Sequence, residues 1–208
     1  MRRRRIFVIP ALVLLIVGCS SMLFKKTPAP LYYQLTYTAK PVSCSASFHK
    51  GLRIWDFNGD NPYDQSQMVV EESDGKTLYS TEFQWVAEPG KLVAQSLLRD
   101  MSTSAIFPRV AGESEAGTYD MNLTGRVFQF VLKRSGESDR AVLQVTVSLS
   151  EKGTTPRVLL RKTYTLKSRA LTNDDSAAFA DAMSELMSEF SDHLREDLCA
   201  KAADLQQP

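Results

Sequence analysis

Cys19 is the residue whose surroundings most clearly indicate chemistry. It follows Gly18 at the end of a segment that opens with Arg2–Arg5 and continues as an apolar run from Ile6 to Val17. This layout is typical of a signal peptide, and the run is too short to span a bilayer comfortably. A small residue directly before a cysteine matches the lipobox, in which the thiol receives a diacylglycerol before cleavage. We predict that residues 1–18 are removed and that Cys19 is lipidated; a buried helix with a free thiol is the alternative that the arginines disfavour.

A lipid on Cys19 would anchor the chain without any further apolar segment, because two or more acyl chains hold a protein on a membrane. Ser20 follows it, and the absence of an aspartate retention signal favours the outer membrane. Residues 20–30 contain two prolines and predict a tether of at most ~35 Å. Residues 22–26 either lie in the lipid interface or belong to a plain linker. We expect a single soluble domain, residues 31–208, that faces the periplasm.

The two remaining cysteines, Cys44 and Cys199, would lie in an oxidising compartment where disulfides persist. We predict that they pair. The alternatives are two free thiols or a bond to another chain, because the sequence does not show whether the two Cα atoms approach within ~7 Å.

Other catalytic or metal-binding patterns are weak. His49 and His193 lie far apart in the sequence, so no paired-histidine metal motif can be written. The segment 56–60 resembles a calcium loop only at its start, because Asn61 stands where that loop needs glycine and Gln67 where it needs glutamate. No phosphate-binding loop or nucleophile elbow is present. We therefore predict no enzymatic activity, no metal and no cofactor besides the covalent lipid.

The net charge of the processed chain argues against nucleic acid as a partner. Removal of the four arginines from the 25 basic residues leaves 21 against 24 acidic residues, a net charge near −3. No basic footprint for nucleic acid remains.

Aromatic residues concentrate in the first half of the chain. They could line a pocket for an acyl chain or form a docking patch for a partner, and packing between a helix and the sheet is the alternative. The five residues are Trp55, Phe57, Tyr63, Phe83 and Trp85.

Hydrophobic periodicity predicts an α+β domain with a mostly antiparallel sheet of five to seven strands and two principal helices. Alternation and turn signals place strands at 31–38, 51–57, 67–72, 77–85, 119–134, 140–150 and 157–167, with a turn at 58–64. Helical spacing predicts a helix from Pro89 to about Ser104 and a long amphipathic helix from the capping residues 172–175 to about Ala203.

The last helix has two distinct faces. Its apolar stripe comprises Phe179, Met183, Leu186, Met187, Phe190, Leu194 and Leu198. Its acidic residues, Asp181, Glu185, Glu189, Asp192 and Glu196, form either a solvated face or a docking surface for a basic partner. At ~45 Å the helix exceeds a small sheet, so its far end either overhangs, contacts another subunit of a homo-oligomer, or frays.

The order of short motifs along nearly the whole chain resembles the ABC-type transport auxiliary lipoprotein family. The motifs are GCSS before the tether, LYYQL at 31–35, Tyr63-Asp64 before Met68-Val69-Val70, Trp85 to Pro89 opening a helix with Leu97 and Leu98, Ile106-Phe107, and the strand residues Tyr119, Leu123, Gly125, Val127 and Phe130. The chain departs at Gln65, Ser66 and Gln67, where relatives often carry arginine or tyrosine.

The resemblance implies a non-enzymatic role beside MCE-domain proteins and an inner-membrane ABC or permease complex, which move phospholipid or other hydrophobic molecules between membranes. The resemblance implies no catalytic residues. The one residue to which it gives a defined role is Cys19, the lipidation site. The alternative function is a periplasmic carrier that itself binds a lipid or another hydrophobic ligand.

Overall fold

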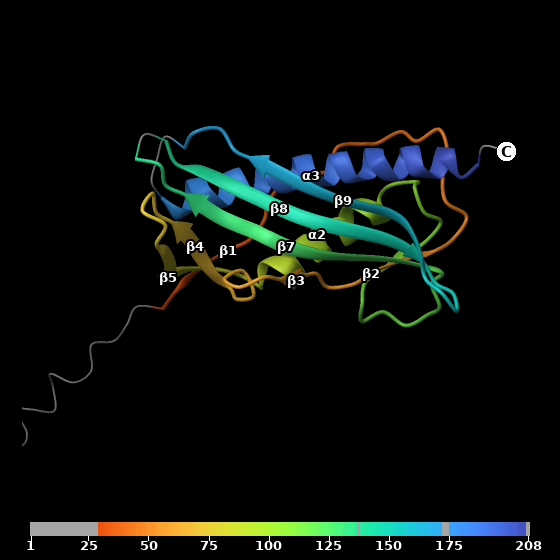
Figure 1. Ribbon diagram of the computed structural model, residues 1–208, viewed down its shortest axis with the longest axis horizontal. Helices are drawn as coiled ribbons and strands as arrows, with labels where there is room; N and C mark the ends of the chain where they lie inside the picture. The colour runs from red at the N-terminus through yellow and green to blue at the C-terminus, as the bar shows by residue number, and fades with distance from the viewer. Residues whose placement is uncertain (1–28, 137, 172–174, 207–208) are drawn as a thin grey trace, which may run out of the picture. The chain divides into compact units, whose positions relative to one another are not determined.

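The computed structural model describes residues 29–136, 138–171 and 175–206 (Figure 1). The predicted signal peptide, Cys19 and the tether up to residue 28 lie outside the described residues. From Leu31 onward the chain forms one compact unit. Among the described residues, no helix combines the length and apolar character that a membrane crossing needs.

Three long antiparallel strands form the regular part of the sheet. They are β7 (Met121–Lys133), β8 (Arg140–Glu151) and β9 (Arg157–Lys167). Leu123 of β7 lies opposite Leu149 of β8, and Val145 of β8 lies opposite Tyr164 of β9. Every second residue of β8 from Ala141 to Leu149 is buried. Strict alternation therefore located these strands correctly. β7 and β8 bury many residues, whereas in β9 only Tyr164 is buried.

Six shorter strands complete a nine-stranded mixed sheet among the described residues. They are β1 (Leu31–Tyr33), β2 (Leu52–Ile54), β3 (Asn58–Gly59), β4 (Gln67–Glu71), β5 (Thr77–Trp85) and β6 (Val110–Ala111). Five of the eight strand pairings are parallel, and β4–β5, β7–β8 and β8–β9 are antiparallel. The sheet is therefore mixed and has more than the five to seven strands predicted, whereas the α+β class with two helices is confirmed and the longest pairings, β7–β8 and β8–β9, are antiparallel as predicted.

Three of the parallel pairings arise because residues 52–71 run alongside β7 in the same direction. β2 pairs with β7 at Met121–Leu123, β3 pairs with β7 at Arg126–Val127, and β4 pairs with β7 at Val131–Lys133. These three short strands therefore run one after another along the same edge of β7. The segment 58–64, predicted as a turn alone, contains β3 because two of its residues join this interrupted neighbour.

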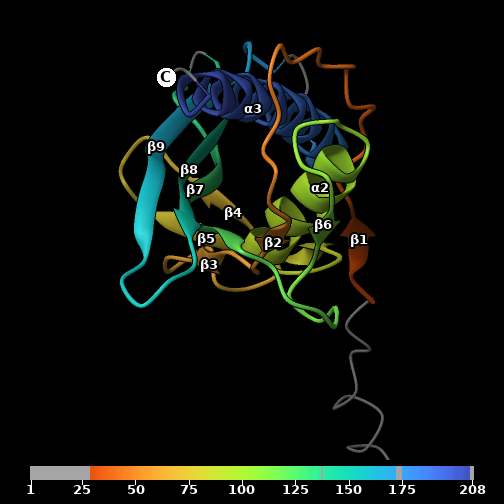
Figure 2. The same ribbon diagram turned by 90° about the vertical axis from the view of Figure 1, so that its right-hand side faces the viewer.

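Two helices pack on the concave side of the sheet. Figure 2 shows the sheet curving around α2 (Pro89–Ser102), with α3 (Ser176–Asp204) lying across the open side. All seven residues of the predicted stripe of α3 are buried. Asp175 caps this helix by accepting a hydrogen bond from the backbone N–H of Ala178. The far end of α3 does not overhang, because Ala202 is only 1% exposed and Gln206 donates to the carbonyl of Ser47.

The start of α2 approaches the sheet so closely that only glycine fits there. A Cβ atom on Gly90 would lie 1.9 Å from the carbonyl oxygen of Phe57. Backbone atoms cannot move aside as a flexible side chain can. The contact sets how closely α2 packs beside β3.

Replacement of Gly90 by alanine should therefore destabilise the fold, although alanine favours a helix interior by roughly 0.5–1 kcal/mol over glycine. We expect the free energy of unfolding to fall by about 1–3 kcal/mol, the usual cost of overpacking. Urea denaturation measures the change. Gly153→Ala is the matched control, because its Cβ would meet its nearest neighbour, the Thr155 carbonyl oxygen, at an ordinary 3.6 Å. Stability of Gly90→Ala equal to wild type would contradict the close approach.

Candidate functional site: an apolar cleft and a disulfide-linked strap

An irregularity in β5 opens a cleft beside the first strand. Gln67 of β4 pairs with Gln84, and Val69 of β4 pairs with Tyr79, so four residues of β5 lie opposite the single residue Met68. Within this bulge, the backbone N–H of Phe83 donates to the hydroxyl of Ser80 at 2.9 Å. A bulge leaves residues out of the ladder and bends the strand. Residues 80–83 consequently line the cleft instead of packing against β4.

The cleft has a volume of about 440 Å³, which lies within the range of small-molecule sites. Its apolar lining comes from β4, β5, β7 and α3, namely Met68, Val70, Leu78, Tyr79, Phe83, Leu132 and Phe179. Three charged residues, Glu82, Arg134 and Asp175, also line it. Arg134 forms an ion pair with Glu72 at 3.0 Å, and Asp175 caps α3. The lining therefore suits an aliphatic chain better than a polar substrate.

Residues 34–48, which we call the strap, cross both helices as an extended segment without joining the sheet (Figure 2). The sequence predicted that the first strand continues to Thr38, but β1 ends at Tyr33. Leu35 and Tyr37 still pack against the core. The backbone N–H of Thr36 donates to the hydroxyl of Ser184 in α3 at 3.0 Å. Exposed and partly buried residues alternate along much of the strap, as they do in a strand, because one side of the strap packs against the helices.

A buried carboxylate links the strap to both helices. Asp100 of α2 is 0% exposed. Its Oδ2 accepts hydrogen bonds at 2.6 Å from the hydroxyls of Tyr37 in the strap and Ser191 in α3. Its Oδ1 accepts a hydrogen bond from Nε of Arg99 at 2.9 Å, and that guanidinium also stacks over the Tyr37 ring. Three donors therefore satisfy a charge that would otherwise be costly to bury.

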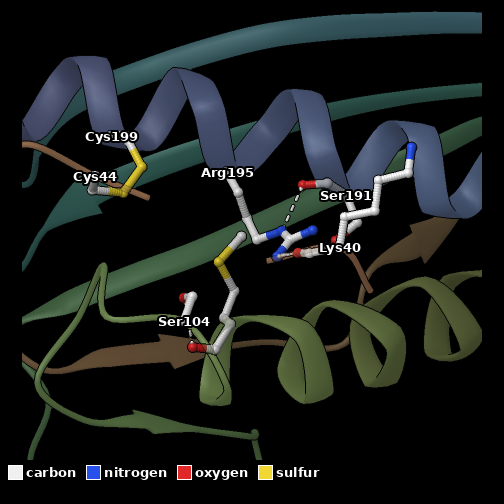
Figure 3. The surroundings of a disulfide bond; sticks show 7 residues. Lys40, Cys44, Ser104, Ser191, Arg195 and Cys199 are labelled. Carbon is white, nitrogen blue, oxygen red and sulfur yellow. Dashed lines mark hydrogen bonds between the residues drawn. A yellow bond between two sulfur atoms is a disulfide. The ribbon is translucent and has the colours of Figure 1, made fainter. Parts of the chain in front are cut away.

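A buried arginine and a disulfide hold the next part of the strap (Figure 3). Arg195 of α3 is 2% exposed, and it donates to the carbonyls of Lys40 at 2.7 Å and Ser191 at 3.3 Å. One turn further along α3, Cys199 is bonded to Cys44, with their Cα atoms 5.3 Å apart. The strap is therefore connected to α3 by hydrogen bonds and by a covalent bond.

Loss of this disulfide should destabilise the domain. The two cysteines are separated by 155 residues, and closing so long a loop restricts the unfolded chain strongly. We expect Cys44→Ser with Cys199→Ser to lower the free energy of unfolding by about 2–5 kcal/mol. Denaturation of the double variant measures this, and the same loss should appear in wild type under reducing agent. A reducing agent that leaves wild type unchanged would show that the bond does not form in the purified protein.

Three tyrosines should make the fold sensitive to alkaline pH. Burial, with a smaller effect from Glu71, raises the pKa of Tyr63 from 10.0 to about 12. Burial and hydrogen bonds to Asp100 and Asp197 raise the pKa values of Tyr37 and Tyr164 further. The folded state holds these protons more tightly than the unfolded chain. The contribution of Tyr63 to stability is therefore complete below pH 10 and is lost as the pH rises through 12, and the contributions of Tyr37 and Tyr164 are lost at still higher pH.

A spectrophotometric titration of tyrosinate can check this expectation. Tyr63→Phe should remove one late-ionising group and lessen the fall in unfolding free energy between pH 10 and 12. Tyr32→Phe, at a side chain 61% exposed, serves as the control for a surface tyrosine. If all the tyrosines of the folded protein ionise together near pH 10, the expectation is wrong.

The five aromatic residues proposed as a patch do not lie together. Trp85, Phe57 and Tyr63 are core residues, exposed by 1%, 4% and 7%. Phe83 lines the apolar cleft. Trp55 is 37% exposed and lines a separate pocket of about 280 Å³, where its Nε1 donates to Asn122. This corrects the expectation of one shared aromatic surface, and core packing explains three of the five residues.

The remaining candidate residues are not assembled into a site. His49 and His193 are exposed, His49 after the strap and His193 on the solvated side of α3. Asp181, Glu185, Glu189 and Glu196 are exposed as well, whereas Asp192 pairs with Arg195 and Lys40. Within the described ranges, no group of three or more potential ligand side chains is arranged to hold a metal ion.

Solved structures share this fold. A Xanthomonas campestris protein of the DUF330 family superposes with a TM-score of 0.74 at 18% identity, covering 86% of this chain and 100% of that one. A second, uncharacterized protein gives a TM-score of 0.62 at 14% identity, covering 82% and 99%. A hypothetical protein from Chlamydia trachomatis gives 0.53 at 5% identity, covering 74% and 98%. These identities show likeness of fold alone.

Sequence comparison gives the more specific result. No curated protein matches the chain closely enough to count as a relative. The family model described as the ABC-type transport auxiliary lipoprotein component matches residues 62–194, which is more than half of the chain. This span runs from the segment before β4 to the fifth turn of α3, and it includes the bulge of β5 and the whole cleft lining. The chain belongs to the ABC-type transport auxiliary lipoprotein component family, which points to a transport-associated, non-enzymatic protein of the cell envelope.

Proposed function

We propose that this protein is the lipid-anchored auxiliary component of an MCE/ABC-type transport system that moves phospholipid or other hydrophobic molecules between membranes. The family match over residues 62–194 is the observation that carries the proposal. The lipobox around Cys19 and the following Ser20 support anchoring at the outer membrane, facing the periplasm. The partners would be an MCE-domain protein and an inner-membrane ABC or permease complex. Self-association of the anchored domain also belongs to the proposal.

The short tether supports a docking role on physical grounds. At ~3.3 Å per residue, residues 20–30 keep the domain within ~35 Å of its anchor. Confinement raises the effective concentration of the domain at a nearby docking site, so weak contacts are enough for high occupancy. The auxiliary component would thereby hold a conduit at the membrane and would need no chemistry of its own.

Affinity purification tests the docking proposal directly. The full-length protein, tagged at its C-terminus, is isolated from solubilised envelopes, and co-purifying proteins are identified by mass spectrometry. We expect recovery of an MCE-domain protein. An unrelated tagged lipoprotein from the same envelopes provides the control for chance association in detergent. Repeated recovery of no MCE-domain protein, with the bait intact and lipidated, would count decisively against the proposal.

The apolar cleft favours a second candidate function, a carrier for a lipid or another hydrophobic ligand. Its volume of about 440 Å³ and its lining by Met68, Leu78 and Phe179 would accommodate an acyl chain. Native mass spectrometry of the purified protein separates the two functions, because a carrier retains a ligand and an adapter does not. Leu132→Glu, which places a charge in the cleft, should abolish ligand retention if the protein is a carrier.

A further inference from the structure

The exposed apolar side chains of the domain are concentrated at one edge of the sheet. Nine large hydrophobic residues are exposed among the described residues, and five of them lie on β1, on β5 or directly after β5. These five, which we call the apolar edge, are Leu31, Tyr32, Leu78, Tyr79 and Val86, with exposures of 44–61%. Apolar surface gathered in this way marks a site of contact with another molecule or a membrane.

Strand pairing places the residues of the apolar edge along β1 and β5. Leu31 and Tyr32 pair with Phe83 and Gln84 of β5, and the backbone N–H of Val86 donates to the carbonyl of Tyr33 at 2.8 Å. Leu78 and Tyr79 follow on the other side of the β5 bulge, where both also line the cleft. β1 has no strand partner besides β5 within the described part of the chain.

The opposite edge of the sheet has a different chemistry. β9 pairs only with β8 among the described residues, and it carries four basic residues, Arg157, Arg161, Lys162 and Lys167. Charged side chains on an edge strand are a common protection against unwanted association. The sequence of β1, Leu-Tyr-Tyr, contains no charge. The two edges therefore differ in residue type, mainly basic at β9 and apolar at β1.

The position of β1 in the chain indicates which surface the apolar edge contacts. β1 is the first element of the domain and begins only twelve residues after Cys19, a distance of at most about 40 Å when fully extended. The apolar edge is thus the part of the domain that is tied most directly to the predicted anchor. Tyr32 and Tyr79 suit the boundary between lipid and water, because an aromatic ring and a hydroxyl prefer opposite sides of it.

We propose that the apolar edge lies on the surface of the bilayer to which the chain is anchored, and that this contact orients the domain. The proposal rests on the proposed lipid anchor, since anchoring supplies the high local concentration at which five apolar side chains are sufficient. The contact is apolar rather than electrostatic, because Glu82 is the charged residue of β5 and would oppose an anionic surface. The contact therefore does not require anionic lipid, and a bilayer of zwitterionic lipid is sufficient for it.

Tryptophan quenching by brominated lipid tests the proposal in the full-length lipidated protein. Tyr32→Trp reports on the apolar edge, and Val158→Trp reports on the basic edge from a side chain of similar exposure, 57% against 61%. Both variants keep Trp55 and Trp85, so their difference isolates the introduced ring. In vesicles of brominated phosphatidylcholine we expect the added emission at position 32 to fall by about half or more and that at position 158 to stay unchanged, regardless of salt.

The outcomes separate this proposal from the anchor itself. Failure of the protein to float with vesicles would refute the anchor. Flotation with equal quenching at both positions, or with none at position 32, would leave the anchor intact and overturn the orienting contact. A tryptophan at position 32 that is shielded from aqueous acrylamide yet unquenched by brominated lipid would show that another protein chain covers the apolar edge, which also overturns the proposal.

Discussion

Asp100→Ala should lower the free energy of unfolding by about 3–5 kcal/mol, because it removes one member of a buried charged network. The carboxylate is fully buried and accepts hydrogen bonds from Tyr37, Ser191 and Arg99. Its removal leaves two hydroxyls without their acceptor and Arg99 without its counter-charge. Domain stability is about 5–15 kcal/mol in total, so the variant should unfold at a much lower urea concentration.

Two controls identify the cause of this loss. Tyr37→Phe removes one hydrogen bond and should cost only about 1 kcal/mol. Asp74→Ala changes an exposed aspartate paired with Lys76, and should change stability by less than about 0.5 kcal/mol. Combining Tyr37→Phe with Asp100→Ala should cost less than the sum of the two, because they share a contact. An Asp100→Ala protein as stable as Tyr37→Phe would mean that the network contributes little.

When residues 1–18 are exchanged for a secretory signal peptide that is cleaved without prior lipidation, Cys19→Ser is expected to move the processed protein from the membrane fraction to the soluble fraction. Serine cannot receive the thioether-linked lipid, and each buried methylene of an acyl chain contributes about 0.8 kcal/mol to membrane binding. The apolar edge alone cannot replace two or more acyl chains. Fractionation of envelopes, together with the intact mass of the product, measures both the location and the modification.

Cys44→Ser is the matched control for Cys19→Ser. It removes a different cysteine and breaks the disulfide to Cys199, but it leaves the lipobox unchanged. This variant should remain in the membrane fraction with the mass of a lipidated chain. A Cys19→Ser protein that keeps its membrane location after removal of residues 1–18 would show that another feature anchors the chain.

Local patterns were sufficient to predict the elements whose apolar residues follow a regular period. α2, β8, β9 and α3 were predicted within about three residues, because their side chains alternate at the period of their own backbone. The N-cap at Asp175 likewise follows from a local preference. Such signals identify an element but not its neighbours.

Long-range pairing explains what the sequence could not predict. The residues of β2 and β4 read as strands, but nothing local indicates that both run parallel to β7. The cleft has the same origin, since it draws on residues from four elements and depends on a bulge. Three successive polar residues, Ser80, Thr81 and Glu82, interrupt the alternation of β5 and were the available signal. The aromatic hypothesis failed because size alone does not separate a buried Trp85 from an exposed Trp55.

The disulfide of the strap also determines how the domain would respond to a pull on its anchor. Tension arriving at Leu31 would first separate the three residues of β1 from β5 and then peel the strap from the helices. Peeling stops at Cys44, where the force passes covalently into α3. Fourteen residues, or about 45 Å of slack, would be released before β7, β8 or β9 is strained. The distance between the membrane and the helices and long strands of the domain could thus increase until the disulfide bears the tension, while those elements stay folded.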